Sequence, residues 1–202
     1  MGLFQKTSEK GNAYSTGAAF LKRQADANAR LQHKYAEGAL AEGRRLVFDT
    51  LQEPILWVRD SKDLMLVVKM MRSDPSLMMN YLSSLTAYDN KDKKDGPKRF
   101  VVVYNLYSIS LHIRVRIKLA VEDGEAVPTM VNEWKGANWL EREVWDLFGI
   151  PFEGHPNLRR IMMDERTTGH PLRKEYPIRQ REPFGNNIDF HLGAHKLPKT
   201  EA

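Results

Sequence analysis

The chain of 202 residues contains no cysteine. This absence excludes disulfide bonds, and it also excludes iron–sulfur clusters and zinc sites that depend on thiolate ligands. Few other side chains can replace cysteine in these sites, so the absence of cysteine is strong evidence against them. We therefore expect this chain to hold no iron–sulfur cluster of its own.

The sequence also lacks long apolar runs and the fingerprints of several common sites. Charges interrupt its apolar stretches well before the roughly 18 residues that a membrane span needs. No apolar segment follows the early lysines, so no signal peptide is expected. No Gly-x-Gly-x-x-Gly, Walker or Gly-x-Ser-x-Gly motif occurs, which excludes the usual cradles for dinucleotides and ATP and the usual serine nucleophile. We predict no catalytic residue, no cofactor site and no metal site in this chain.

Positive charge is in modest excess, with a formal net charge of +5. A basic surface suits RNA, anionic lipid headgroups or an acidic partner protein. The RNA-binding alternative depends on one strand face that carries His112, Arg114, Arg116 and Lys118. That face is expected to lack interleaved aromatic residues on which bases stack. The sequence therefore predicts no nucleic-acid partner.

The first half of the chain begins with a polar tail over residues 1–20 and then turns helical. Short apolar runs joined by a polar turn of hairpin length follow. Ser73, a capping residue two positions before a proline, then favours the start of another helix. The predicted elements are a helix, two strands of a hairpin and a second helix, at Phe20–Leu51, Ile55–Val58, Leu64–Val68 and from Ser73 to before Asp89.

Strand signals are clearest in the second half. Phe100–Leu106 is apolar on both alternating sets, as is typical of a strand covered on both faces. Leu111–Leu119 alternates apolar and basic residues, as is typical of a half-buried strand. A short strand at Ala126–Val127 and a helix from Pro128 to Phe148 follow. The charged loop Asp89–Pro97 is expected to be exposed.

This order of elements predicts an α+β fold, a single domain whose mainly antiparallel sheet is packed by helices. Residues 1–50 form an N-terminal tail and helical extension, and residues 51–150 form the core domain. A long irregular segment of Pro, Gly, His and Arg follows. A loop of that length is uncommon in a compact domain unless something holds it. We therefore expect residues 151–202 to wrap a partner subunit.

Residues 137–150 carry the most informative pattern. On a helical projection the apolar residues cluster on one face, with Glu141 and Glu143 on opposite flanks. Two carboxylates that point apart do not converge on one substrate, which disfavours a catalytic acid–base pair. Arg142 and Asp146 stand at the i,i+4 spacing of an ion pair. An exposed helix with ion pairs fits this pattern, and a helix buried at an interface fits it better, because tryptophans lie beside the charges.

A Gly-His-Pro tripeptide occurs twice, at residues 154–156 and 169–171. In each copy the glycine permits a sharp turn, and the histidine before proline is driven to an extended conformation. Together with His191 and His195, these histidines raise the alternative of a metal site. The Gly-His-Pro tripeptide is not a helical His-x₃-His arrangement, and no carboxylate recurs at a ligand offset. Anchoring of loops by the histidines and the basic pairs after them is the favoured interpretation.

These motifs stand in a recognisable order, with Glu-Arg-Glu at 141–143, Asp-Leu-Phe-Gly-Ile at 146–150, Arg-Arg-Ile at 159–161 and Gly-His-Pro-Leu-Arg-Lys at 169–174. This order resembles the signature of the 30-kilodalton (C subunit) family of respiratory complex I, the proton-pumping NADH:quinone oxidoreductase. The match covers about residues 137–177. The residues carried over as signature and interface positions are Glu141, Arg142, Glu143, Trp145, Asp146, His155, Arg159, Arg160, Asp164, His170, Arg173 and Lys174.

The resemblance implies a peripheral-arm subunit that holds no cofactor itself. It implies FMN and iron–sulfur clusters in partner subunits of an enzyme that passes electrons from NADH to quinone and translocates protons. The chief partner implied is the large subunit that shapes the quinone pocket, so the chain belongs to a hetero-oligomer and meets the membrane only through it. The implied location is the inner membrane, on its cytoplasmic face in bacteria or its matrix face in mitochondria.

One nearer alternative stays open at the level of the sequence. The equivalent subunit of another complex I-like enzyme carries a similar signature. Such enzymes include membrane-bound hydrogenases, coenzyme-F420 oxidoreductases and photosynthetic ferredoxin-dependent complexes.

Overall fold

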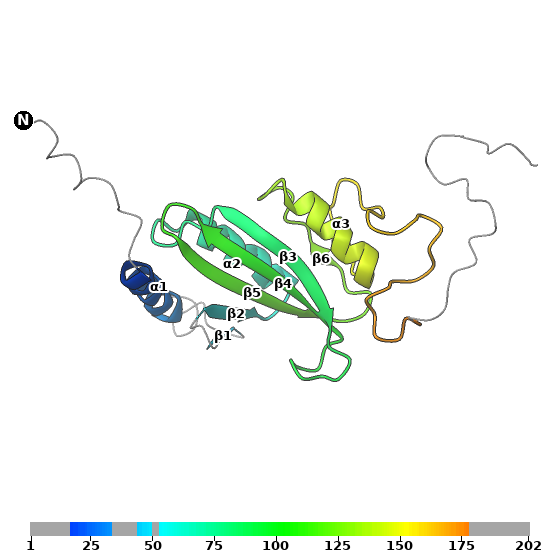
Figure 1. The fold of residues 1–202 in the computed structure, drawn as a ribbon, viewed down its shortest axis with the longest axis horizontal. Coiled ribbons are helices and arrows are strands. Elements are labelled where there is room, and N and C mark those ends of the chain that lie inside the picture. Colours follow the sequence, from blue (N-terminus) through cyan, green and yellow to red (C-terminus); the bar gives the residue numbers. More distant parts are fainter. Residues whose placement is uncertain (1–16, 34–43, 50–52, 178–202) are drawn as a thin grey trace, which may run out of the picture.

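The computed structural model describes residues 17–33, 44–49 and 53–177. A five-stranded sheet forms the centre of this part of the chain, with α1 at one end and α3 at the other (Figure 1). The elements are α1 Gly17–Leu31, β1 Arg45–Phe48, β2 Pro54–Val58, α2 Ser61–Ser73, β3 Tyr81–Asp89, β4 Phe100–Ser108, β5 Ile113–Val121, β6 Val127–Pro128, α3 Ala137–Phe148 and β7 Phe152–Glu153.

The large sheet has the strand order β1-β2-β5-β4-β3. β3, β4 and β5 form an antiparallel meander, and β1 pairs antiparallel with β2. β2 joins the meander in parallel with β5. A separate parallel pair of β6 and β7 brings the chain after α3 back beside the chain before it. The mainly antiparallel sheet with packed helices confirms the α+β prediction.

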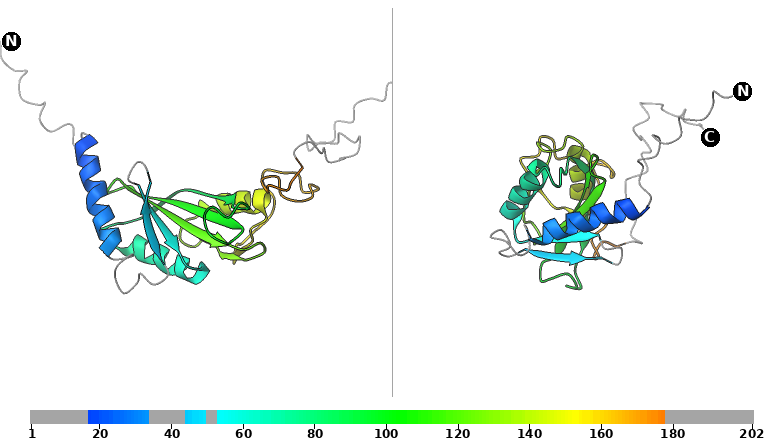
Figure 2. Two further views of the ribbon diagram at one scale, coloured as in Figure 1. Left: turned by 90° about the horizontal axis from the view of Figure 1, so that it is seen from below. Right: turned by 90° about the vertical axis from the view of Figure 1, so that its left-hand side faces the viewer.

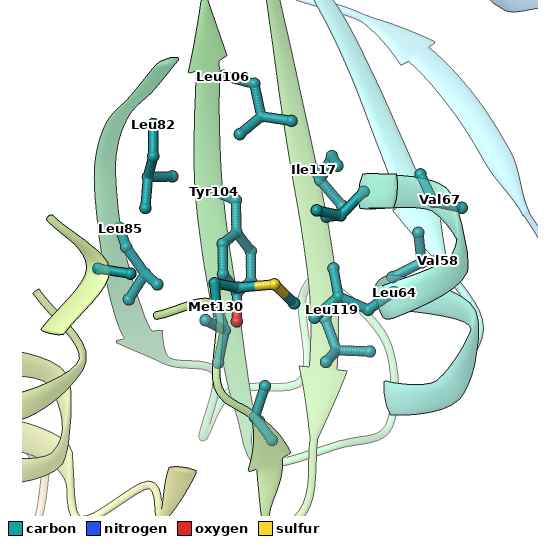
Figure 3. Packing of buried hydrophobic residues seen from close by; sticks show 14 of the residues in the cluster. Val58, Leu64, Val67, Leu82, Leu85, Tyr104, Leu106, Ile117, Leu119 and Met130 are labelled. Carbon is teal, nitrogen blue, oxygen red and sulfur yellow. The ribbon is translucent and has the colours of Figure 1, made fainter. Parts of the chain in front are cut away.

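The hydrophobic core lies between the sheet and the helices α2 and α3. Leu64 and Val67 of α2 pack over Ile117 and Leu119 of β5, and Tyr104 of β4 lies beside them (Figure 3). All five side chains are fully buried. Burial of a large apolar side chain contributes about 1.5–3 kcal/mol. α3 packs along β3, so the core positions this helix at one edge of the sheet.

Helix α1 closes the opposite end of the sheet (Figure 2). Gln24 lies on its buried face, and its side chain hydrogen-bonds to the backbone of β5 as a neighbouring strand would. Its Nε2 donates to the carbonyl oxygen of Arg114, and its Oε1 accepts from the Arg114 N–H, both at 3.1 Å. The parallel pairing of β2 with β5 begins only at Ile55 opposite Arg116. The glutamine amide therefore satisfies backbone groups of β5 that lie beyond the paired part of β2.

The predicted strand Leu64–Val68 is wrong, because these residues lie within helix α2. Asp60 caps the helix, its side chain accepting from the N–H of Asp63 at 2.8 Å. The buried residues of α2 recur with helical spacing, at Leu64, Val67, Val68 and Met71. The predicted hairpin is therefore also wrong. A short apolar run on its own does not distinguish a buried strand from a helix face.

The predicted helix after Ser73 is wrong as well. Asp74 ends α2, and its Oδ1 accepts from the N–H of Ser76 at 2.9 Å, which closes a turn. The chain then enters strand β3, which contains a β-bulge between Leu82 and Ser84. The extra residue leaves Leu82 and Leu85 both buried. Their spacing of three imitates a helix, which explains the error.

The other element boundaries are partly confirmed. β4 and β5 match the predicted strands, and β6 overlaps the predicted strand Ala126–Val127. The first predicted helix, Phe20–Leu51, is too long, since α1 ends at Leu31 and residues 45–48 form β1, while residues 34–43 lie outside the description. The last predicted helix begins at Ala137 and not at Pro128, which pairs with β7.

The sheet face opposite the core carries the basic residues of β5, as predicted, together with aromatic rings from neighbouring strands. Lys118 Nζ lies 5.1 Å from the ring centre of Trp57 and 5.3 Å from that of Tyr88. Arg114 lies 5.9 Å from the ring centre of Tyr107. The expectation of a face without aromatics is therefore wrong, because strand pairing supplies rings that the β5 sequence does not contain. These rings are occupied by cations of the chain itself.

Candidate docking site on helix α3

Helix α3 and the segment after it form one folded unit, in which the segment returns alongside the helix (Figure 1). Gly149 ends the helix in a left-handed conformation with φ 75°, and its N–H donates to the Trp145 carbonyl at 2.8 Å. A Cβ at this position would lie 2.5 Å from the ring of His170 and 2.8 Å from the guanidinium of Arg173. Glycine therefore permits both the turn and the close return of the segment.

Asp146 is fully buried on α3 and gathers the returning loop around its carboxylate. Its Oδ1 accepts from Arg160 Nη1 at 2.5 Å. Its Oδ2 accepts from the N–H groups of Ile161, Met162 and Met163 at 3.0, 2.8 and 2.8 Å. Burial raises the pKa of Asp146, but these N–H donors and the guanidinium outweigh it and lower the pKa overall. The carboxylate is therefore ionised and organises the loop.

Arg142 is also buried and binds the same loop. Its Nε and Nη2 donate to the carbonyl oxygens of Arg159 and Arg160 at 3.1 and 3.0 Å. Its guanidinium lies 5.3 Å from the ring centre of Trp139. Arg142 and Asp146, at i,i+4 spacing, thus both bind the loop. The arginine donates to its carbonyls, and the aspartate accepts from its N–H groups. Buried backbone groups need such partners.

The two histidines of the Gly-His-Pro repeats anchor the segment at two points on α3. His155 Nδ1 accepts from the Asn157 N–H at 3.0 Å, so its Nε2 carries the proton that is donated to the Asn138 carbonyl at 3.1 Å. His170 Nδ1 donates to the Asp146 carbonyl at 2.9 Å. The glycine before each histidine has a positive φ, 78° and 77°. The structure thus anchors the loops through turns and histidines, in the way that the sequence interpretation favoured.

The other predicted positions lie around this centre and do not converge with it. Trp145 packs edge-on against the His170 ring, with ring centres 6.3 Å apart. Asp164 accepts from the N–H and the Nε of Arg166, both at 2.9 Å. Glu143 is half-buried and Arg159 is exposed. In the described part of the chain, no group of three or more His, Asp and Glu side chains is arranged to hold a metal ion.

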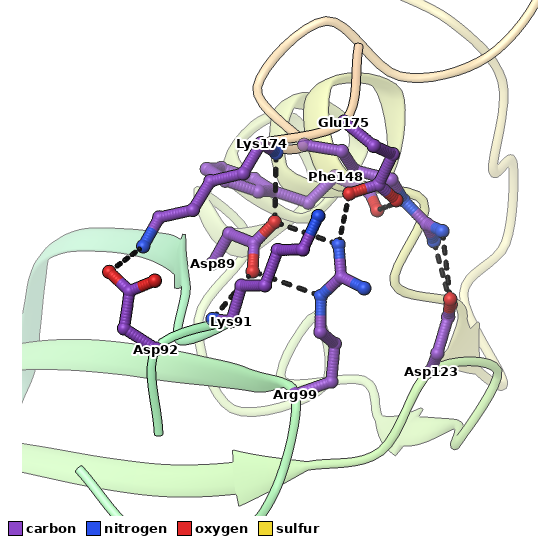
Figure 4. Close-up of polar contacts among 9 residues, drawn as sticks. Asp89, Lys91, Asp92, Arg99, Asp123, Phe148, Lys174 and Glu175 are labelled. Carbon is purple, nitrogen blue, oxygen red and sulfur yellow. Dashed lines mark hydrogen bonds and ion pairs between the residues drawn. The ribbon is translucent and has the colours of Figure 1, made fainter. Parts of the chain in front are cut away.

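A network of ion pairs fastens the end of the segment to the sheet (Figure 4). Asp89 accepts from Nε and Nη2 of Arg99 and from the N–H of Lys174, each at 2.9 Å. Arg99 also pairs with Glu175, and Lys174 Nζ reaches Asp92 at 2.7 Å. Burial raises the pKa of Asp89, but Arg99 and the N–H donors outweigh it, so the net pKa is lowered. The segment and the sheet end are thus joined through one ionised carboxylate.

Arg173 adds a second attachment between the segment, α3 and the sheet. Its Nε donates to the Phe148 carbonyl at 2.6 Å, and its two Nη atoms reach Asp123 at 2.9 and 2.8 Å. The expectation that the loop from Asp89 is exposed is wrong at its start, since Asp89 and Asn90 are buried. The sequence offered one hint for Asp89, an acidic residue at the end of an apolar stretch. It offered none for its pairing with Lys174.

Glu141 differs from Asp146 although both are fully buried on α3. Its carboxylate accepts from Thr129 Oγ1 and from the Met130 N–H, both at 2.6 Å. Burial raises the pKa of Glu141 to about 7, because these two hydrogen bonds only partly offset it. Tyr104 contributes a buried hydroxyl that lacks a hydrogen-bond partner among the described residues. Glu141 thus takes up a proton far more readily than Asp146 does.

Comparison with known proteins identifies the family. The model of the "respiratory-chain NADH dehydrogenase, 30 Kd subunit" family matches residues 57–182, more than half of the chain. The chain belongs to this family. Relatives in the 30-kilodalton family include the C subunit of the NADH-quinone oxidoreductase of Geobacter sulfurreducens, 48% identical over 56% of this chain and 70% of that protein. The C subunit from Geotalea uraniireducens is 46% identical over 63% of this chain and 76% of that protein.

Two further likenesses extend the family comparison. The C/D subunit of the NADH-quinone oxidoreductase of Bdellovibrio bacteriovorus is 37% identical over 62% of this chain, which covers 24% of that longer protein. A chain of an archaeal respiratory membrane complex, the membrane-bound sulfane sulfur reductase, shares the fold with a TM-score of 0.60 and 18% identity, over 76% of this chain and 86% of that one. No helix in the described ranges is both long and apolar enough to cross a membrane.

Proposed function

We propose that this chain is a cofactor-free scaffolding subunit of NADH:quinone oxidoreductase, and that the α3 unit docks against the large subunit that shapes the quinone pocket. One observation carries the proposal. The side chains of Arg142 and Asp146 turn inward and bind the unit's own loop. In contrast, Trp139, Met162 and Leu172 remain 63%, 63% and 51% exposed. Large apolar side chains on a rigid, internally satisfied frame suit a permanent protein interface.

The geometry of the carboxylates supports scaffolding over catalysis. Asp146 already accepts four hydrogen bonds from the chain, and Glu141 is enclosed beside the core. A general acid or base must lie within hydrogen-bond reach of a substrate. Neither carboxylate offers that access, so we infer that electron transfer from NADH to quinone takes place on other subunits, which hold FMN and iron–sulfur clusters. The coupled proton translocation would likewise take place outside this chain.

The longer relatives support the choice of partner. In Bdellovibrio bacteriovorus and in a Psychrobacter species, proteins named as C/D subunits match this chain over only 24% and 25% of their length. Fusion of two subunits keeps them at high local concentration, which suits direct neighbours. We infer that the large quinone-pocket subunit corresponds to the D portion and is the docking partner. The assembled complex would hold this chain at the periphery of the inner membrane, on the cytoplasmic or matrix face.

Truncation of the exposed tryptophan tests the docking proposal. Tryptophans at the centre of an interface cost about 2 kcal/mol or more when they are cut back to alanine. Trp139→Ala should therefore lower the amount of chain that co-purifies with the large quinone-pocket subunit in mild detergent. Leu66→Ala is the matched control, because Leu66 is 48% exposed on α2, away from the proposed interface. Quinone-reductase activity per assembled complex should stay normal in both variants, and normal assembly with lost activity in Trp139→Ala would overturn the scaffolding role.

A further inference from the structure

The open face of the sheet contains a groove that the α3 unit does not use. The groove has a volume of about 530 Å³ and is lined by side chains of β3, β4 and β5, among them Tyr81, Ser84, Asn105, Arg114 and Arg116. These residues alternate along their strands with the core residues, so they lie on the face away from α2 and α3.

Arg116 is held in place by a chain of hydrogen bonds across three strands. Asn105 Nδ2 donates to Ser84 Oγ at 2.8 Å, and Arg116 Nε donates to Asn105 Oδ1 at 2.9 Å. This contact uses the Nε of the arginine, while its two terminal nitrogens face the carboxylates of Glu53 and Asp49. A guanidinium fixed in this way loses little freedom when it binds a carboxylate.

The present acidic partners of the two arginines are distant and shared. Arg116 reaches Glu53 at 3.5 Å and Asp49 at 3.6 Å, and Arg114 reaches the same Glu53 at 3.5 Å. Charge-assisted hydrogen bonds are typically about 2.7–2.9 Å long. The side chain of Arg114 is 62% exposed. The arginines therefore retain donor capacity for another carboxylate.

Exposed apolar side chains lie where the chain before β3 meets the β4–β5 turn. Tyr81, Met78 and Ile109 are 49%, 38% and 56% exposed. These two segments are tied together, since the N–H of Ile109 donates to Asn80 Oδ1 at 3.1 Å. Met78 and His112 hold positive φ angles of 46° and 56°, a conformation that non-glycine residues adopt rarely and that recurs at ligand clamps.

We propose that this groove is a second docking surface, which binds an acidic segment of another subunit of the assembly. A carboxylate of that segment pairs with Arg114 and Arg116, and an apolar neighbour packs on Tyr81 and Ile109. RNA is disfavoured because Lys118 occupies the rings of Trp57 and Tyr88.

The inference rests on the proposed function only in taking the partner from the same assembly. Photo-crosslinking of the assembled complex in membranes tests it, with p-benzoylphenylalanine in place of Ser83, an exposed residue that lines the groove. The same probe in place of Leu66 on α2 is the control. We expect the groove probe, and not the control, to capture a peptide of another subunit that contains Asp or Glu beside an apolar residue.

Charge reversal completes the test. Arg114→Glu should reduce the groove cross-link by about tenfold or more, and exchange of the captured acidic residue for lysine should restore it. Capture of a second copy of this chain, of lipid or of RNA, capture of a segment without a carboxylate, or a cross-link that Arg114→Glu leaves unchanged would each overturn the inference. Failure of Trp139→Ala to weaken assembly, with the groove cross-link intact, would reject the α3 interface and leave the groove in place.

Discussion

Glu141 and Asp146 show how two buried carboxylates on one helix acquire opposite properties. Both side chains are fully enclosed. Asp146 accepts from a guanidinium and three N–H groups, which together outweigh the cost of burying its charge. Glu141 accepts from only one hydroxyl and one N–H. These two donors do not outweigh the cost of burying its charge, so its pKa rises to about 7. The number of donors, and not burial alone, decides the charge of each group.

The raised pKa of Glu141 predicts a stability that falls as pH rises. The folded chain holds this proton up to about pH 7, while the unfolded chain releases it near its ordinary pKa of 4.5. Stability should therefore be lost between these pH values, by roughly 3 kcal/mol in total, and should then level off. In Glu141→Gln this slope should disappear, as measured by urea unfolding at several pH values. An equal slope in both proteins would assign the titration to another group.

Asp146→Asn should be far more costly than an ordinary surface change. The substitution removes the charge that Arg160 faces and turns an amide N–H₂ toward backbone donors. Breaking a buried ion pair from one side costs about 3–5 kcal/mol. We expect faster proteolysis within residues 159–169 and a lower thermal midpoint. Asp164→Asn is the control, because its partner Arg166 is 53% exposed, and it should change stability by less than about 1 kcal/mol.

At the scale of elements, strands β4 and β5 and the end of α3 could be predicted because their local pattern agrees with their burial. Helix α2 and strand β3 could not, for two physical reasons. The apolar residues of helix α2 form a run that also suits a strand. The bulge in β3 gives Leu82 and Leu85 a helical spacing. In both places, packing against the rest of the chain decides whether the segment forms a helix or a strand.

Gly149 offers a test of how tightly the segment closes on α3. Gly149→Ala forces a side chain into left-handed backbone and places its Cβ 2.5 Å from the His170 ring. Gly124→Ala is a matched control, since Gly124 has a similar φ of 81° and nothing within 4 Å of the added Cβ. The control should cost about 1–2 kcal/mol, as left-handed backbone does for residues other than glycine, and Gly149→Ala clearly more. Equal losses in thermal unfolding would show that the His170 contact yields freely.

For the molecule as a whole, the resemblance predicted the family, but not the partners of the residues that it singled out. Local spacing suggested that Arg142 meets Asp146, whereas tertiary structure gives each a different part of the loop. Asp89 and Lys174 are 85 residues apart in the chain, and no local pattern links them. The predicted wrapping of a partner by residues 151–202 remains a proposal, because residues 151–177 pack on their own chain and residues 178–202 lie outside the description.

Asp89→Asn tests whether the network in Figure 4 holds residues 172–176 against the ends of β3 and β4. The change weakens the bonds from Arg99 and from the Lys174 N–H at once. Amide hydrogen exchange at residues 172–176 should rise at least about tenfold, while exchange in β4 stays slow. Lys174→Ala removes only the pair with Asp92, in which both side chains are largely exposed, and should leave that exchange nearly unchanged. Similar exchange in all three proteins would place the restraint elsewhere.

The glutamine of α1 has a consequence for the chain before it meets any partner. An unpaired stretch of strand invites a strand from another molecule, and this is a common route to aggregation. Gln24 binds the N–H and the carbonyl of Arg114 with its side chain, so these groups do not pair with a strand of another molecule. These two backbone groups of β5 are therefore closed to a strand of a second chain. Helix α1 thus covers this edge of β5 in the isolated chain, independently of any role in the assembled complex.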